Sequence, residues 1–197
     1  MATFLPHEYS RVRPETVGFA APVVDLKLDD AANDSGVGEP LIRGPNIVPG
    51  YWNKPEATAA AIDPAGWFHT GDVGYFDAGG YLHLCDRKRD MVISGGVNIY
   101  PAEIESVLVN MPDVADGCVF GIPDDEFGEK LMAVVQPMPG KTLDPQAIRA
   151  YLAEHLANYK VPSRIEIQND LPREDSGKIF KRRLREPFWE GREKQIS

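Results

Sequence analysis

The chain has 197 residues, of which 43% are hydrophobic and 26% charged, proportions typical of a soluble globular protein with one ordinary domain or two small ones. Its formal net charge of -9 argues against nucleic-acid or anionic-membrane binding, because both need a basic surface. No apolar run is long enough to cross a membrane and no signal-peptide pattern follows Met1, so a cytoplasmic location is expected.

The first part of the sequence predicts mostly β-structure. Short segments with alternating apolar and polar residues are separated by turn residues. They span 23–28, 39–43, 73–76 and 81–84. The last two flank Asp77-Ala78-Gly79-Gly80, which is typical of a hairpin turn. We therefore expect a β-rich region over residues 1–85.

A dense charge cluster follows this region. Asp86-Arg87-Lys88-Arg89-Asp90 has no apolar residue that could anchor it in a core. Few core contacts would oppose rotation of such a segment, so residues 86–90 are predicted to be a domain boundary or hinge.

Residues 91–197 mix helical and strand patterns, which predicts an α+β domain. A helix is expected to begin at Pro101, because proline is favoured at the first helical position and acidic residues follow it in the first turn. An amphipathic helix is predicted over 144–156. Strands are predicted over 117–122, 131–135 and 165–167.

Neither cysteine is placed for chemistry. Cys85 and Cys118 lie in apolar, strand-like surroundings and are interpreted as buried, reduced thiols. No His or Cys residues stand at metal-ligand spacing, so the sequence predicts neither a metal site nor a nucleophilic triad.

A glycine turn near the C-terminus presents Lys178, within the run Leu171–Ile179. A lysine ammonium on a short loop can reach charge that develops during acyl or phosphoryl transfer. Taken alone, a Gly-Lys pair such as Gly177-Lys178 is more typical of a solvated turn. The surrounding residues 173–197 hold 8 Lys/Arg against 5 Asp/Glu, which either attracts a polyanionic small molecule or forms a solvated helix face.

Five motifs in order give the turn a context. They are Gly44–Trp52, Gly66–Asp72, Asp86–Glu105, Tyr159–Pro162 and the Lys178 turn. In this order, from about residue 20 to about residue 186, the chain resembles the adenylate-forming acyl-CoA synthetase superfamily. Ser94-Gly95-Gly96 followed by Asn98-Ile99-Tyr100-Pro101 is more similar to acid–CoA ligases of the fatty-acid or aromatic-acid type than to peptide-synthetase adenylation domains.

The resemblance implies a two-step reaction. An acid and ATP give an acyl-adenylate and pyrophosphate, and the thiol of CoA then displaces AMP. It also implies that residues 1–85 are the barrel-like end of a large AMP-binding domain. Residues 91–197 would then be a mobile small α+β domain, whose short, mostly antiparallel sheet is flanked by helices.

Three residues acquire roles in ATP binding and catalysis through the resemblance. Asp72 would accept hydrogen bonds from the two ribose hydroxyls, a task that suits the two oxygens of a carboxylate. Arg87 would offer its donor fork to ribose or phosphate oxygens. Lys178 would bridge the acid carboxylate and the α-phosphate as charge grows in the transition state.

The resemblance places the hinge and the CoA channel in one motif, Asp86–Glu105. Arg89 matches the hinge position about which the small domain rotates between the two half-reactions. Ser94, Gly95 and Gly96 would face the pantetheine channel of CoA, where a thin glycine backbone suits a narrow passage. Glu103 is interpreted mainly as an acid that supports the start of its helix.

The sequence also departs from the family pattern. Members are longer, and neither their phosphate loop nor the Glu that binds Mg²⁺ is found between Met1 and Ser35. We therefore expect the chain to need a large N-terminal domain, which would supply the Mg²⁺ ligand, and to be inactive alone. Glu174 and Asp175 beside Lys178 either restrain it or face water.

Two alternative functions remain open at this point. The chain could be a non-catalytic module that binds a nucleotide or a protein partner. It could also belong to an adenylating enzyme that transfers the acyl group to a carrier protein rather than to CoA.

Overall fold

The structure, a computed structural model, describes residues 2–29 and 36–191. Contacts divide the chain into two compact units, Met1–Lys88 (unit 1) and Arg89–Ser197 (unit 2). The division falls inside the charge cluster 86–90, and rotation at this point remains a prediction. Residues 30–35, part of the stretch searched for a phosphate loop, and 192–197 of the basic C-terminal stretch lie outside the described residues.

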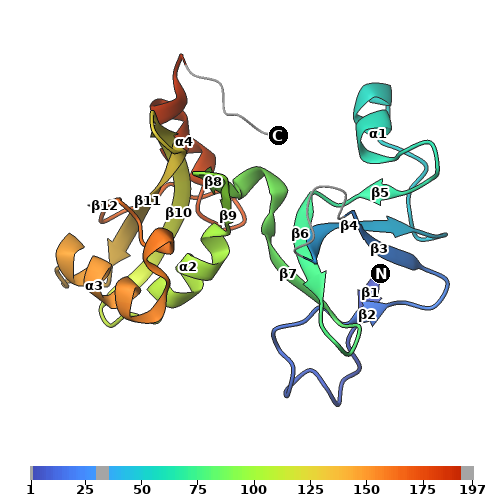
Figure 1. The fold of residues 1–197 in the computed structure, drawn as a ribbon, viewed down its shortest axis with the longest axis horizontal. Helices are drawn as coiled ribbons and strands as arrows, with labels where there is room; N and C mark the ends of the chain where they lie inside the picture. Colours follow the sequence, from blue (N-terminus) through green and yellow to red (C-terminus); the bar gives the residue numbers. More distant parts are fainter. Residues whose placement is uncertain (1, 30–35, 192–197) are drawn as a thin grey trace. The chain divides into compact units, whose positions relative to one another are not determined.

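The described part of unit 1 consists of short antiparallel strands and one helix (Figure 1). Its main sheet has the strand order β3-β4-β6-β7, with β5 beside β4, while β1 and β2 form a separate pair. The elements are β1 (Thr3–Phe4), β2 (Phe19–Ala20), β3 (Asp25–Asp29), β4 (Val37–Arg43), α1 (Pro55–Ala61), β5 (Phe68–His69), β6 (Asp72–Phe76) and β7 (Leu82–Arg87). The β-rich character is confirmed, but the described strands form open sheets and no closed barrel.

The hairpin predicted between β6 and β7 is present. Oδ1 of Asp77 accepts hydrogen bonds from the backbone N–H groups of Gly79 and Tyr81, both at 2.9 Å. An aspartate can close a turn in this way because its side chain replaces a backbone acceptor. The hairpin brings Asp72 and Arg87 opposite each other on adjacent strands.

Unit 2 is a sheet with helices on both faces (Figure 1). Strands β10, β11, β8 and β9 are antiparallel neighbours in that order, and β12 runs parallel to β11. The strands are β8 (Val92–Ser94), β9 (Val97–Ile99), β10 (Val114–Asp124), β11 (Gly128–Pro137) and β12 (Arg164–Ile167). The helices are α2 (Pro101–Leu108), α3 (Pro145–His155) and α4 (Lys181–Trp189), with short 3₁₀ turns η1 (Lys88–Asp90) and η2 (Asn158–Lys160). The predicted α+β class with a mostly antiparallel sheet is confirmed.

The two faces of this sheet carry separate clusters of buried side chains. Val119 belongs to the cluster with Ile104 of α2 and Ile148 of α3. Phe120, the next residue of β10, belongs to the other cluster, against which Phe188 of α4 packs. Successive side chains of a strand point to opposite faces, so a strand covered on both faces is apolar throughout. This explains the unbroken apolar run at 117–122.

The predicted helix starts are also found. Pro101 opens α2, and Asp144 caps α3 by accepting a hydrogen bond from the N–H of Gln146 at 3.1 Å. Neither cysteine forms a disulfide within the described residues; the prediction of burial is confirmed for Cys118, whereas Cys85 is only half-buried. None of the described helices is both long and apolar enough to span a membrane.

Candidate functional site

Asp72 and Arg87, two of the three residues predicted to bind ATP, are in direct contact. Their strands pair so that the two residues face each other, and Nε of Arg87 lies 3.0 Å from Oδ1 of Asp72. The Asp72 side chain is 24% exposed and that of Arg87 58%. Within the described residues, Oδ2 of Asp72 and the terminal nitrogens of Arg87 make no further hydrogen bond. An acceptor and a donor fork are thus open to a polar ligand such as a ribose.

The surroundings make Asp72 more basic than an ordinary aspartate. Burial raises the pKa of its carboxyl, the charge of Arg87 opposes this rise, and the nearby carboxylate of Glu39 adds to it. The net shift is upward because burial disfavours the charged form, and hydrogen bonds donated by a ligand would favour the carboxylate again.

The turn before Asp72 is fixed by a residue to which the sequence analysis gave no role. Glu39 lies in β4, is buried, and accepts a hydrogen bond at 2.8 Å from the N–H of Gly71. The sequence held one indication of this role: Glu39 is an acid in a predicted strand that continues with the apolar residues Leu41 and Ile42. Charged groups are rarely buried unless they are paired.

Lys178 stands at the end of a narrow turn in unit 2. Arg173 and Ile179 pair as an antiparallel bridge, and the N–H of Glu174 donates to the Lys178 carbonyl at 2.9 Å. Gly177 closes the turn with φ +84°, a conformation that favours glycine. Lys178 is exposed, and its ammonium has no ion-pair partner among the described residues. The turn therefore presents an available cation.

The arginine at the base of this turn holds it to the sheet. Nη1 of Arg173 donates to the Gly177 carbonyl at 2.9 Å, while Nη2 reaches Oδ2 of Asp116 at 2.8 Å and Oε1 of Gln136 at 3.2 Å. Asp116 and Gln136 are opposite each other on β10 and β11. A planar fork can hold several acceptors at once, and Arg173 uses it to fix the turn over the sheet.

A second ion pair holds the chain just after the turn. Nζ of Lys181 lies 2.7 Å from Oε1 of Glu105 on α2, and the same oxygen accepts from the N–H of Val119 at 2.7 Å. In the sequence, Glu105 was identified only as the last residue of the Asp86–Glu105 motif. Both sides of the Lys178 turn are consequently anchored within unit 2.

Ser94, Gly95 and Gly96 form the turn between β8 and β9. Both glycines have positive φ, +57° and +82°. The N–H of Gly95 donates to the Phe127 carbonyl at 2.9 Å, and a Cβ at Gly95 would lie only 3.0 Å from the Phe127 ring. The positive φ favours glycine at both positions, and at Gly95 a side chain would in addition crowd the Phe127 ring.

Arg89 and Glu103 have different environments. The Arg89 side chain is 80% exposed, and its Nε lies 3.9 Å from Oδ2 of Asp90. Glu103 is in the first turn of α2 and also binds Nζ of Lys160 through both carboxylate oxygens, each at 2.7 Å. This second contact joins the helix start to the Tyr159–Pro162 motif and supports the structural interpretation of Glu103.

Glu174 and Asp175 are both exposed. In the described part of the chain, neither carboxylate forms an ion pair with Lys178. This arrangement agrees with the alternative in which the two acids face water.

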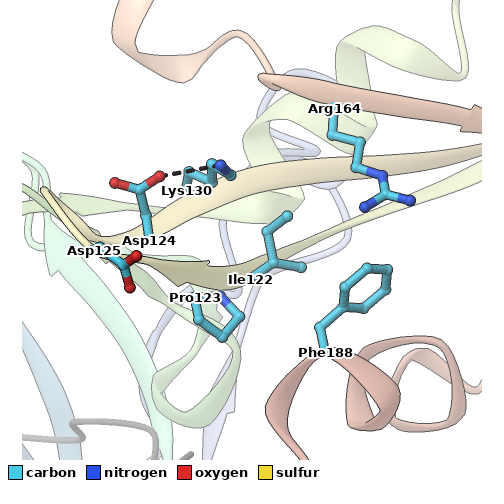
Figure 2. A pocket seen from close by; sticks show the side chains of 7 residues that line it. All are labelled: Ile122, Pro123, Asp124, Asp125, Lys130, Arg164 and Phe188. Carbon is cyan, nitrogen blue, oxygen red and sulfur yellow. Dashed lines mark ion pairs between the residues drawn. The ribbon is translucent and has the colours of Figure 1, made fainter.

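A hollow of about 360 Å³ in unit 2 contains none of the predicted site residues. Figure 2 shows Lys130 paired with Asp124 on one side and Arg164 facing the ring of Phe188 on the other. Arg164 also binds Glu166 at 2.5 Å. Because both cations already have acidic partners, we assign no ligand to this hollow. Nowhere in residues 2–29 and 36–191 do three or more His, Cys, Asp or Glu side chains gather as a metal site.

Comparison with known proteins identifies a domain of a known family. The model of the AMP-binding enzyme C-terminal domain matches residues 103–178, a span that begins in α2 and ends at Lys178. The chain contains this domain, and its solved structural neighbours include enzymes of the adenylate-forming superfamily, whose C-terminal portion it matches.

Curated relatives of this superfamily include CoA ligases. The chain is 43% identical to 2-succinylbenzoate–CoA ligase of Geobacillus kaustophilus, over 94% of this chain and 38% of the relative. It is 48% identical to a feruloyl-CoA synthase of an Amycolatopsis species, over 77% of this chain and 30% of the relative. The chain thus spans about a third of the length of these adenylate-forming relatives.

A solved structure shows the same fold. The o-succinylbenzoate CoA synthetase of Bacillus subtilis, in complex with its acyl-adenylate intermediate, superimposes with a TM-score of 0.84 at 34% identity. The match covers 93% of this chain and 38% of that one.

Proposed function

We propose that this chain forms the C-terminal part of an ATP-dependent acid–CoA ligase. The observation that carries the proposal is the cross-strand pair of Asp72 and Arg87, which leaves an acceptor and a donor fork open side by side. The anchored turn that presents Lys178 adds the cation that adenylation needs.

In the first half-reaction, a carboxylate oxygen of the acid attacks the α-phosphorus of ATP, and the bond to pyrophosphate breaks. Asp72 accepts hydrogen bonds from the ribose hydroxyls, and Arg87 donates to ribose or phosphate oxygens. Lys178 lies between the attacking carboxylate and the α-phosphate and stabilises the charge that grows there. Mg²⁺ bound with ATP neutralises phosphate charge, and we assign its protein ligands to the part of the relatives that this chain does not match.

In the second half-reaction, the deprotonated thiol of CoA attacks the acyl carbonyl carbon, and the bond to AMP breaks. Unit 2 turns about Arg89, which withdraws Lys178 and presents the Ser94–Gly96 turn to the pantetheine arm. The exposed Arg89 side chain and the positive-φ glycines of the turn support these assignments.

The acid is chosen outside the matched region. The two relatives named above act on 2-succinylbenzoate and on a feruloyl group, yet both resemble this chain at 43% and 48% identity. Residues shared by ligases of such different acids fit a common role in nucleotide and thiol chemistry.

The test joins this chain to the N-terminal two thirds of the Geobacillus ligase and supplies 2-succinylbenzoate, Mg²⁺-ATP and CoA. We expect pyrophosphate release from the fusion and none from the 197-residue chain alone. Lys178→Ala should lower the adenylation rate by about 10²- to 10³-fold, because it removes a cation that acts on developing charge. Thioester formation from supplied acyl-adenylate should be retained.

Lys141→Ala is the matched control. Lys141 also follows a positive-φ glycine and is exposed, but it pairs with Asp113 at 2.9 Å. Its removal should leave both half-reactions unchanged. Equal loss of both half-reactions in Lys178→Ala would reject the catalytic role, and transfer to a phosphopantetheinyl carrier but not to CoA would reassign the acceptor. If a correctly folded fusion binds AMP but releases no pyrophosphate, the non-catalytic alternative is favoured.

A further inference from the structure

Glu39 is a buried carboxylate that joins two parts of unit 1. Its side chain is 6% exposed, and both of its oxygens are occupied. Oε1 accepts from the N–H of Gly71 at 2.8 Å, and Oε2 accepts from Nζ of Lys88 at 3.1 Å. His69 Nδ1 lies 3.6 Å from Oε2. Charge-assisted hydrogen bonds of this kind are among the stronger ones in proteins.

The partners of Glu39 are also bonded to each other. The backbone N–H of Lys88 donates to the Gly71 carbonyl at 2.8 Å. Gly71 therefore gives its N–H to Glu39 and its carbonyl to Lys88, while Lys88 is held through both its backbone and its side chain. The three residues form a closed ring of hydrogen bonds that none can leave without breaking two contacts.

The neighbours of this ring are the residues of functional interest. Gly71 directly precedes Asp72, and Lys88 lies between Arg87 and Arg89. Lys88 is also the last residue of unit 1. Two residues of the ring are thus sequence neighbours of the pair proposed to bind nucleotide, and one of them, Lys88, directly precedes the proposed hinge residue Arg89.

We propose that Glu39 is a positioning residue that holds the Asp72 turn and the last residue of unit 1 as one piece. The inference deepens the proposed function and rests on it, because Glu39 can position the nucleotide site only if Asp72 and Arg87 bind the nucleotide. A further consequence is that backbone rotation begins at Arg89 and not before, since Lys88 is fixed to Gly71 and Glu39. The positions of Asp72 and Arg87 would therefore not change when unit 2 rotates.

The test uses Glu39→Gln in the full chain. Glutamine keeps the size and an acceptor oxygen but loses the charge that holds Lys88. We expect amide hydrogen exchange at Gly71 and Lys88 to become about tenfold faster, as for the loss of a hydrogen bond to a charged group. The dissociation constant for AMP should rise by a similar factor. Exchange at Val73 and Leu82, which are buried in the sheet, should stay unchanged.

Two further variants complete the design. Lys88→Met removes the same contact from its half-exposed partner, and it serves if Glu39→Gln does not fold. Asp25→Asn is the control, because Asp25 lies in the same sheet but pairs with Arg43 at the surface. It should change neither exchange nor AMP affinity.

The outcomes separate this inference from the proposed function. Unchanged exchange at Gly71 and Lys88 in folded Glu39→Gln or Lys88→Met overturns the ring, whatever the chain does with AMP. Faster exchange with unchanged AMP affinity overturns the positioning role. If the unaltered chain binds no AMP, the same comparison is made with the ligase fusion. Failure of the fusion to bind AMP counts against the nucleotide site itself, and against positioning by Glu39 with it.

Discussion

The two units are held together in different ways. In the described part of unit 1, the buried large aliphatic side chains are Leu41, Val73 and Leu82, and they lie in a unit that also buries Glu39 and His83. Unit 2 packs apolar side chains on both faces of its sheet. Burial of apolar surface is the main favourable term in folding, so unit 2 has the larger share of it.

The two units therefore depend on different kinds of interaction. Unit 1 relies on polar contacts such as the Glu39 ring, whose geometry fixes the Asp72 turn. Unit 2 has a conventional core, on which the Lys178 turn is mounted by ion pairs. The first unit should therefore respond to pH and charge substitution, and the second to changes of core volume.

The two cysteines test this contrast most strongly. Burial, followed by the charge of Glu105, raises the pKa of the Cys118 thiol to about 12 from an ordinary 9.0. Its thiolate population should fall by on the order of a thousandfold, because each pKa unit is a factor of ten. Iodoacetamide should modify half-buried Cys85 well before Cys118, as followed by peptide mass spectrometry. Equal labelling under native conditions would show that the core of unit 2 opens readily.

A core truncation should affect unit 2 alone. Leu152 of α3 is completely buried, and Leu152→Ala should destabilise unit 2 by about 2–5 kcal/mol through lost burial and the cavity left behind. Hydrogen exchange should accelerate in β10 and β11 and remain unchanged in β4 and β6. Met138→Ala, at an exposed apolar residue, is the control. Parallel acceleration in both units would mean that they unfold as one.

Arg173→Ala should loosen the Lys178 turn without unfolding unit 2. The guanidinium links the Gly177 carbonyl to Asp116 and Gln136, and we expect its loss to slow adenylation by about tenfold, the value of one charged hydrogen bond. Arg173→Lys should rescue little, because an ammonium lacks the planar fork. The rate is measured in the ligase fusion, together with amide exchange at Glu174.

Arg182→Ala provides the comparison for that experiment. Arg182 is 73% exposed and pairs only along its own helix with Glu186 among the described residues, so its loss should change little. If Arg173→Ala and Arg182→Ala have the same adenylation rate, the anchor at Arg173 has no part in presenting Lys178.

The smallest effect is a pH dependence confined to unit 1. Burial works to raise the pKa of Glu39, but the hydrogen bond from Gly71 and the pairing with Lys88 outweigh it, so the pKa lies below its ordinary 4.5. A lowered folded-state pKa gives stability that is fully present above pH 4.5 and is lost as the pH falls through the folded-state value. The melting temperature of unit 1 should therefore fall on acidification.

Glu39→Gln should reduce that acid slope. It should not abolish it, because hydrogen bonding by Tyr81 N–H also lowers the pKa of Asp77 in the same unit. Asp72 acts in the opposite direction, since its raised pKa favours protonation in the folded state. An unchanged slope in the variant would show that Glu39 titrates alike in folded and unfolded chains.

Periodicity and turn residues predicted much of the fold. The 73–84 hairpin, the Pro101 helix and the strands at 117–122, 131–135 and 165–167 were all visible in the sequence, because each shows a clear local pattern. The short strands β8 and β9 of the second sheet were not predicted. Helix α4 was expected only as one of two alternatives for the basic stretch 173–197, a solvated helix face, and its bounds were not predicted, since it carries Pro187 and has no buried residues of its own. Its position depends on packing against β10, through contacts such as that from Trp189 Nε1 to the Gly121 carbonyl at 3.0 Å.

For the candidate site, the sequence predicted the functional residues but not the residues that hold them in place. Motif order pointed to Asp72, Arg87 and Lys178, because such residues sit in recognisable runs. Their supports were not predicted, since Glu39 and Arg173 contact residues 32 and 57 positions away, Gly71 and Asp116 respectively. Contacts over such separations arise from tertiary structure and leave no local pattern.

The mounting of Lys178 has a practical meaning for protein engineering. The contacts described for its turn, from Asp116, Gln136 and Glu105, all come from unit 2. The lysine proposed to act in adenylation and the residues that hold its turn therefore belong to one unit. Recombination between ligases at the Lys88–Arg89 junction would transfer the lysine together with these contacts, whereas a crossover inside β10 or β11 would separate it from some of them.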